Sequence, residues 1–265
     1  MNIQRPIVIA VVIFGIGVGI SKLFEKKESK TVTLIITCLM SIVANVISAN
    51  IGGTEGPGGT TGPSLHNEEI RQCEIGDTIS FGSYQYDNNG LSSIEWIVID
   101  EDENKLLLLS RYALDCQPYN FRKTDVTWES SSLRQWLNGT FYQVAFNTSE
   151  RAKIVETTVA ADHNPQYPTD PGNDTQDYVF LLSIEELSQY LRTDEERRCR
   201  PTQFAFDQGA YENPSTGCCW WWLRSPGISL SDAASVNSDG RIDYDDGAVN
   251  SSTGAVRPAI WIQKN

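Results

Sequence analysis

The sequence of 265 residues has little basic charge, and this limits the partners that the protein can bind. It contains 21 Lys and Arg against 34 Asp and Glu, which gives a formal net charge of −13 at pH 7. Nucleic acid binding requires a basic patch that neutralises phosphates, so we expect no nucleic acid partner. With 20 Gly and 11 Pro, the chain also lacks the composition of collagen or of a long low-complexity protein.

The side chains that usually perform nucleophilic or metal chemistry are scarce as well. Only two histidines occur, His66 and His163, and the surrounding sequence places them in a linker and a loop. The sequence contains no Cys-x-x-Cys pair of the kind that binds zinc and no Gly-x-Ser-x-Gly motif of a hydrolase. We therefore predict a protein that is not an enzyme. An oxidase or hydrolase is the alternative function, and a structural or envelope-sensing domain is a third.

Two long apolar segments at the start of the chain predict a membrane anchor. Residues 6–24 and 31–51 carry almost no charge, and a spanning helix needs about 20 apolar residues. Four lysines lie within residues 21–30, where the two segments meet, and positive loops stay in the cytoplasm. We expect residues 1–51 to form a helical hairpin in the cell membrane. The alternatives are buried globular helices, or a signal sequence with residues 33–49 as its apolar core.

The remaining chain divides into a linker and one domain. Residues 52–69 are dominated by Gly and Pro and predict a flexible connection. Residues 1–69 contain equal numbers of basic and acidic side chains, so the entire net charge belongs to residues 70–265. This acidic segment is long enough for a single sizeable core. The anchor's predicted orientation places it in the extracellular space.

Local patterns in residues 70–265 predict an α+β domain of short strands and helices. Alternating and β-branched segments indicate a three-stranded meander, and apolar positions three and four apart indicate a helix over residues 128–138. Asn147 with Glu150, and Ser183 with Glu186, are typical of capped helix starts. We expect the meander at residues 76–86, 94–99 and 105–110, a long loop at 163–175, and further strands at 178–182, 220–224 and 259–262.

Several motifs of this domain resemble a bacterial domain family of unassigned function. The C-terminal motifs are residues 221–227 (WWLRSPG), 234–240 (ASVNSDG) and 254–261 (GAVRPAIW), in which Ala255 is inserted relative to the family's pattern. Earlier segments fit in the same order, and the resemblance covers about residues 74–263. These earlier segments are residues 94–96, 127–129, 132–138 and 177–187.

The resemblance implies a C-type-lectin-like fold, similar to the formylglycine-generating-enzyme group and to variable proteins of diversity-generating retroelements. Such a fold holds a loop-rich C-terminal binding surface, which would lie here within residues 228–253. The Ser, Asn, Gly and Tyr of this segment are typical of binding loops. We therefore expect it to bind an extracellular protein or glycan. The candidate ligand-binding residues are Asn237, Asp239, Arg241, Asp243, Tyr244, Asp245, Asp246 and Asn250.

The carboxylates of this surface suggest a second hypothesis, a Ca²⁺ site. Ca²⁺ prefers six to eight oxygen ligands, and Asp243, Asp245 and Asp246 lie within four residues. Their spacing does not match an EF-hand, and the Glu-Pro-Asn and Trp-Asn-Asp signatures of Ca²⁺-dependent lectins are missing. We therefore predict a domain without a cofactor or metal, in which these carboxylates contact a ligand.

The cysteines and two arginines are interpreted as structural. In the expected extracellular location disulfides can form, and the pairing stays open between Cys116–Cys199 and a pair that includes Cys73. Adjacent Cys218 and Cys219 would point to opposite faces of a strand, and Cys38 lies in the apolar N-terminal segment. We predict that Arg224 and Arg257 bind carbonyls or carboxylates inside the domain. The tryptophans at 220–222 fit a core strand better than a sugar-stacking platform.

Overall fold

The first sheet is built from the predicted meander and the last strand of the chain. The computed structural model describes residues 70–87 and 90–264. In it, β1 (Thr78–Asp87), β2 (Gly90–Asp102) and β3 (Lys105–Ser110) pair antiparallel, and β11 (Ala259–Gln263) pairs antiparallel with β3. The sheet order is therefore β1-β2-β3-β11. The three predicted strands of the meander are confirmed. They form because the alternation of apolar and polar residues lets one face of each strand pack on the core.

The second sheet contains the C-terminal motifs. Its order is β4-β10-β7-β8-β9, with β9 at one edge. All six residues of β7 are buried, which confirms a core strand at the tryptophan cluster. Residues 228–253 form less loop than predicted, because β8 and β9 make an antiparallel hairpin there. The strands are β4 Asp115–Cys116, β7 Trp221–Pro226, β8 Asp232–Val236, β9 Ile242–Ala248 and β10 Ala255–Val256.

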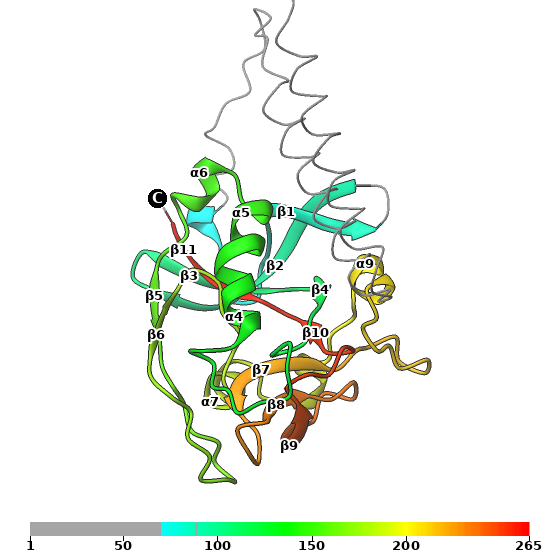
Figure 1. Ribbon diagram of the computed structural model, residues 1–265. Helices are drawn as coiled ribbons and strands as arrows, with labels where there is room; N and C mark the ends of the chain where they lie inside the picture. Colours follow the sequence, from blue (N-terminus) through cyan, green and yellow to red (C-terminus); the bar gives the residue numbers. More distant parts are fainter. Residues whose placement is uncertain (1–69, 88–89, 265) are drawn as a thin grey trace, which may run out of the picture. The chain divides into compact units, whose positions relative to one another are not determined.

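A two-stranded sheet and short helices complete this α+β domain (Figure 1). Both predicted capping boxes are present, at Asn147 before α6 and at Ser183 before α7. Each satisfies two backbone N–H groups that a helix start otherwise leaves unpaired. The two strands are β5 Thr157–Val159 and β6 Thr175–Asp177, and the helices are α4 Ser132–Trp136, η1 Leu137–Phe141, α5 Tyr142–Ala145, α6 Thr148–Arg151, α7 Ile184–Tyr190, α8 Asp194–Arg197 and α9 Gln203–Asp207.

The two larger sheets are joined by the segment between β10 and β11, which runs directly from one sheet into the other (Figure 1). Arg257 lies in this crossing and is 1% exposed. Its guanidinium donates to the carbonyls of Ser110 (3.0 Å) and Arg197 (3.3 Å), and it lies 4.9 Å from the ring centroid of Trp221. The predicted structural role of Arg257 is therefore confirmed.

Two local predictions are wrong, and one side chain explains both. The helix does not stop at Asn138–Gly139 but continues as η1 and α5, and residues 178–182 form a single bridge rather than a strand. The Asn138 amide accepts from the backbone N–H groups of Tyr178 and Val179 and donates to the Val179 carbonyl. These backbone groups are thereby satisfied by a helix side chain instead of a neighbouring strand.

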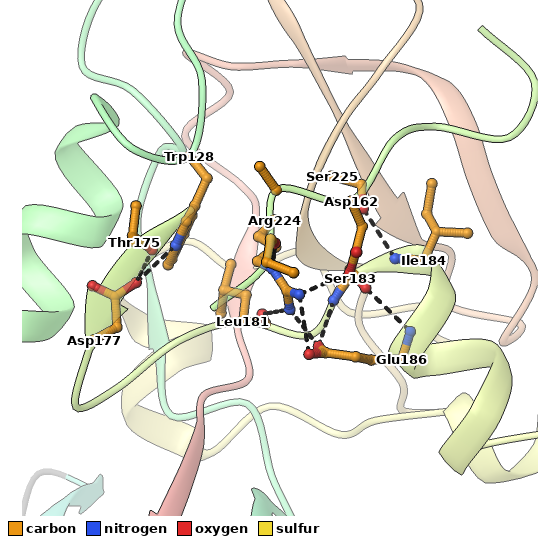
Figure 2. A network of polar contacts seen from close by, with 12 residues as sticks. Trp128, Asp162, Thr175, Asp177, Leu181, Ser183, Ile184, Glu186, Arg224 and Ser225 are labelled. Carbon is orange, nitrogen blue, oxygen red and sulfur yellow. Dashed lines mark hydrogen bonds and ion pairs between the residues drawn. The ribbon is translucent and has the colours of Figure 1, made fainter. Parts of the chain in front are cut away.

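Arg224 of β7 is the most extensively bonded buried cation in the part of the chain that the structure describes (Figure 2). Its side chain donates five hydrogen bonds. Two go to the carbonyls of Ala160 (3.1 Å) and Leu181 (2.9 Å), one to Asp162 (2.9 Å) and two to Glu186. A guanidinium carries five N–H donors, so every donor has an acceptor. This confirms the structural role predicted for Arg224.

A second buried polar cluster surrounds Asp177, which is fully buried (Figure 2). Its carboxylate accepts from Trp128 Nε1 (3.0 Å), Thr175 Oγ1 (2.6 Å) and Arg134 Nε (2.7 Å). Within the described residues, no buried side-chain nitrogen or oxygen lacks a hydrogen-bond partner. The interior therefore combines an aromatic core with fully satisfied polar clusters.

The predicted anchor segments 6–24 and 31–51, the linker 52–69 and Cys38 lie outside the described residues. Across residues 70–87 and 90–264, every helix is too short or too polar to span a bilayer.

We expect Arg224→Met to lower the free energy of unfolding by about 3 kcal/mol, because it leaves two inward-facing carboxylates without their cation. Urea unfolding followed by tryptophan fluorescence measures this change. Arg241→Met is the matched control, since Arg241 pairs with Asp239 on the surface with 74% of its side chain exposed. The control should unfold like the unchanged protein. Equal losses in both variants would contradict the role assigned to Arg224.

Candidate functional site

The first half of the predicted binding surface is the turn between β8 and β9. The backbone of Asn237 bonds to Arg241 and Gly240, which closes the turn. Asp239 and Arg241 form an exposed ion pair at 2.7 Å, and Arg198 donates to the Asp239 carbonyl. These side chains are grouped as predicted, but their polar groups already bind one another.

The second half lies on β9, where side chains alternate between the two faces of the sheet. Tyr244 is half-buried and packs against the core. Asp245 is exposed, and its carboxylate accepts from the Tyr167 hydroxyl at 3.3 Å. The neighbouring carboxyl of Asp243, to which it is hydrogen bonded, raises the pKa of Asp245. The structure therefore brings Asp243 and Asp245 together and directs Tyr244 elsewhere.

Asn250, another of the predicted residues, lies apart from this group. Asn250 is exposed in the turn after β9, and the seven residues of β9 separate it by about 20 Å from the turn at Asn237. Asp246 belongs to β9, but its side chain is outside the described part of the structure. Among the described residues, no three His, Cys, Asp or Glu side chains are arranged to hold a metal ion. Charged side chains on an edge strand also discourage pairing with another chain, which is a structural role for these aspartates.

A hollow with a volume of about 230 Å³, which was not predicted from the sequence, lies beside β1 and β2. It is rich in tyrosine and hydroxyl groups. We call it the tyrosine cavity; it is lined by Tyr84, Gln85, Tyr86, Ser92, Ser93, Ile94, Glu95, Tyr112, Leu114 and Thr202. A sequence signal existed, because Tyr84 and Tyr86 are two apart on a strand and share a face.

The aromatic wall of the tyrosine cavity is held in place by neighbouring rings and charges. Tyr86 and Tyr112 meet edge to face with centroids 5.7 Å apart. The Arg111 guanidinium lies 5.6 Å from the Tyr112 ring and pairs with Glu95 at 3.0 Å. Burial, and next the adjacent hydroxyl of Tyr112, raise the pKa of Tyr86. The Tyr86 hydroxyl therefore keeps its proton at pH 7 and can donate or accept hydrogen bonds.

A buried carboxylate supports the base of this wall. Asp115 accepts from the Tyr84 hydroxyl (2.6 Å), the Cys116 backbone N–H (2.7 Å) and the Gln117 amide (3.2 Å). Burial raises the pKa of Asp115 to about 6, although these three donors act in the opposite direction. Asp115 thus fixes the position of Tyr84 from behind.

We expect the raised pKa of Asp115 to make the stability pH-dependent. Its contribution is fully present below the unfolded pKa of about 3.9 and is lost as pH rises through about 6, with a total of about 3 kcal/mol. Asp115→Asn removes this titration, so the variant should gain stability relative to the unchanged chain between pH 4 and pH 7. Urea unfolding of both chains across this range measures the difference. A difference that stays constant with pH would contradict the assignment.

Comparison with known proteins identifies a family but no characterised relative. Residues 103–264 match the family described as a domain of unknown function, DUF6273. The search of curated proteins gave no match, and neither did the search of solved structures. The match spans more than half of the chain and contains all of the C-terminal motifs. The chain therefore belongs to the DUF6273 family.

Proposed function

We propose that the protein is a non-catalytic binding module that takes part of a glycan into the tyrosine cavity. The observation that carries the proposal is the lining: three tyrosines together with serine, threonine and glutamine side chains around a hollow of about 230 Å³. The apolar faces of tyrosine rings pack against the C–H groups of a sugar, and the hydroxyls bind its polar edge. The volume is smaller than a typical drug-sized pocket, so it fits one sugar unit.

The chemical character of the lining supports binding rather than turnover. The ten lining residues include no Cys, His or Lys, and Glu95, their single carboxylate, is paired with Arg111. A hydrolytic site needs a base or nucleophile positioned against the substrate. The tyrosine hydroxyls instead match the hydroxyl groups of a glycan, because both can donate and accept hydrogen bonds.

We further propose that the domain is displayed outside the cell by residues 1–51 and the linker 52–69. The apolar segments 6–24 and 31–51, and the four lysines within residues 21–30 where they meet, support this arrangement. A C-type-lectin-like architecture is proposed on the sequence motifs. The same motifs support our proposal that the domain is related to variable proteins of diversity-generating retroelements, with residues 228–253 as the variable segment. A reverse-transcriptase gene and a template repeat beside the coding gene would support that relation.

The proposed binding site predicts that Tyr86→Ala weakens glycan binding about tenfold, which corresponds to about 1.4 kcal/mol. Tyr86 is 40% exposed at the cavity, so its removal takes away contact area without opening the core. Tyr211→Ala is the matched control, because Tyr211 is 48% exposed and does not line the cavity. The measurement is a glycan-array screen of the full-length chain, followed by titration of the best ligand.

The same titration separates the two candidate surfaces. The double variant Asp243→Asn, Asp245→Asn changes the edge of β9 and leaves the tyrosine cavity intact. If this double variant loses binding while Tyr86→Ala retains it, the ligand binds the β8–β9 surface and the cavity proposal is wrong. If no glycan binds the folded chain, the proposed ligand class is wrong.

The proposed display predicts that a protease added to intact cells cuts the linker at residues 52–69 and releases the folded domain. Gly- and Pro-rich flexible segments are preferred cleavage sites, whereas packed domains resist. Immunoblotting of the medium and cells follows the product, with a cytoplasmic protein as the control for lysis. A domain that is cut only after the cells are broken would place it inside the cell.

A further inference from the structure

Two cysteines lie directly opposite each other in the interior of the domain. Cys199, which follows α8, and Cys219, which precedes β7, form an isolated antiparallel bridge. The Cys219 backbone N–H donates to the Cys199 carbonyl at 2.8 Å, and the Cys219 thiol approaches the same carbonyl at 3.4 Å. Both residues are at most 2% exposed. This arrangement differs from the expected Cys116–Cys199 pair and from the expected pair that includes Cys73.

The geometry of such a pair matches that of a disulfide. Residues directly opposite in an antiparallel pair have Cα atoms about 4.5–5.5 Å apart and side chains on the same face. A disulfide joins Cα atoms about 4.4–6.8 Å apart. The backbone spacing of the two cysteines therefore permits a disulfide between them.

The thiols of Cys116 and Cys218 are directed to different partners. Cys116 Sγ donates to the Ser252 carbonyl at 3.2 Å, and Cys218 Sγ approaches the Thr216 carbonyl at 3.7 Å. Cys218 is adjacent to Cys219 in an extended segment, so its side chain points to the opposite face. Cys219 is thus the cysteine positioned to react with Cys199.

The surroundings also favour the reactive thiolate form. Burial opposes ionisation of Cys199, but a hydrogen bond from the Cys219 thiol and the positive charge of Arg257 together lower the pKa of Cys199 below its usual value. The same hydrogen bond raises the pKa of Cys219, because Cys219 is the donor. Cys199 is therefore the attacking group and Cys219 the second thiol to react.

We propose that Cys199 and Cys219 form a disulfide when the chain folds in the presence of a disulfide oxidant. In the first step the Cys199 thiolate attacks one sulfur of a small disulfide such as glutathione disulfide, whose S–S bond breaks and releases one thiol. In the second step the Cys219 thiolate attacks Cys199 Sγ and releases the second thiol. The protein loses two protons and two electrons, and the oxidant is reduced to two thiols.

The disulfide would join the two ends of residues 199–219, a segment that supports one side of the tyrosine cavity. The loop between the two cysteines contains Thr202, which lines the cavity, and Phe204 of α9, whose ring lies 5.9 Å from that of Tyr84. A covalent closure restricts the unfolded chain and keeps this segment in place. The inference stands independently of the proposed glycan binding, because it rests on the cysteine geometry alone.

The test exposes the full-length chain in detergent to a glutathione redox buffer at an intermediate urea concentration, where the buried thiols become accessible. After return to native conditions, free thiols are alkylated and the protein is digested without reduction for mass spectrometry. The expected product is a cross-link between the peptides of Cys199 and Cys219, with Cys116 alkylated. The oxidised chain should also melt about 5–10 °C above the reduced chain.

Two variants make the test specific. The double variant Cys199→Ala, Cys219→Ala should lose the difference in melting temperature between oxidising and reducing buffer. Cys116→Ala, the matched control, should retain it. If the double variant does not fold, the mass spectrum of the unchanged chain alone shows whether Cys199 and Cys219 are cross-linked. Alkylation of both Cys199 and Cys219, or a cross-link from Cys199 to any other cysteine, would overturn the proposal and would leave the glycan experiment unaffected.

Discussion

The buried guanidinium of Arg224 is the interaction on which the arrangement of the domain most depends. Moving a cation into the interior costs several kcal/mol unless acceptors replace its water shell. Here four residues from two separate segments supply those acceptors, so β7, the loop before Asp162 and the start of α7 must assemble together. Glu186 adds a second constraint, because its carboxylate also caps α7 by accepting from the Ser183 backbone N–H.

Arg257 is a second buried guanidinium that holds separate segments together, in this case at the crossing between the two larger sheets. Its position in the crossing from β10 to β11 means that a single side chain contacts the end of β3 at Ser110, the end of α8 at Arg197, and the Trp221 ring. A lysine could provide the charge but not a planar group that stacks on a ring while donating in two directions. The motifs that made the sequence recognisable are therefore built around buried arginines, and they describe how the domain is assembled.

The sequence predicted those elements whose cause is local. Alternation of polarity is a property of neighbouring residues, as is the pairing of a cap with a Glu three positions later, so the meander and both capping boxes were correctly predicted. Asn138 shows why the other elements were missed. Its usual meaning before a glycine is a helix end, but about forty residues further on it meets two backbone amides that need an acceptor. That contact exists only after folding.

The site was harder to predict than the fold for a related reason. Arg241 and Asp245 of the predicted surface are exposed and Asp239 is partly exposed, but exposure alone does not make a binding site. The tyrosine cavity combines Tyr84 and Tyr86 with Tyr112 and Thr202, which no sequence window contains together. Only Tyr84 and Tyr86 had a signal in the local sequence, which is their two-residue spacing on β1.

The tyrosine cavity lies mostly outside the region that matches the family, so membership of the family does not define what the cavity binds. The family match begins at residue 103, whereas seven of the ten cavity-lining residues belong to β1 and β2, which precede it. The matched region supplies the arginine clusters and the sheets that hold the wall in place, and the two preceding strands supply most of the surface that a ligand would touch. Two chains with the same matched region could therefore bind different ligands if their first two strands differ. The glycan proposed above therefore rests on the chemistry of Tyr84, Tyr86 and Tyr112 and not on the family to which the chain belongs.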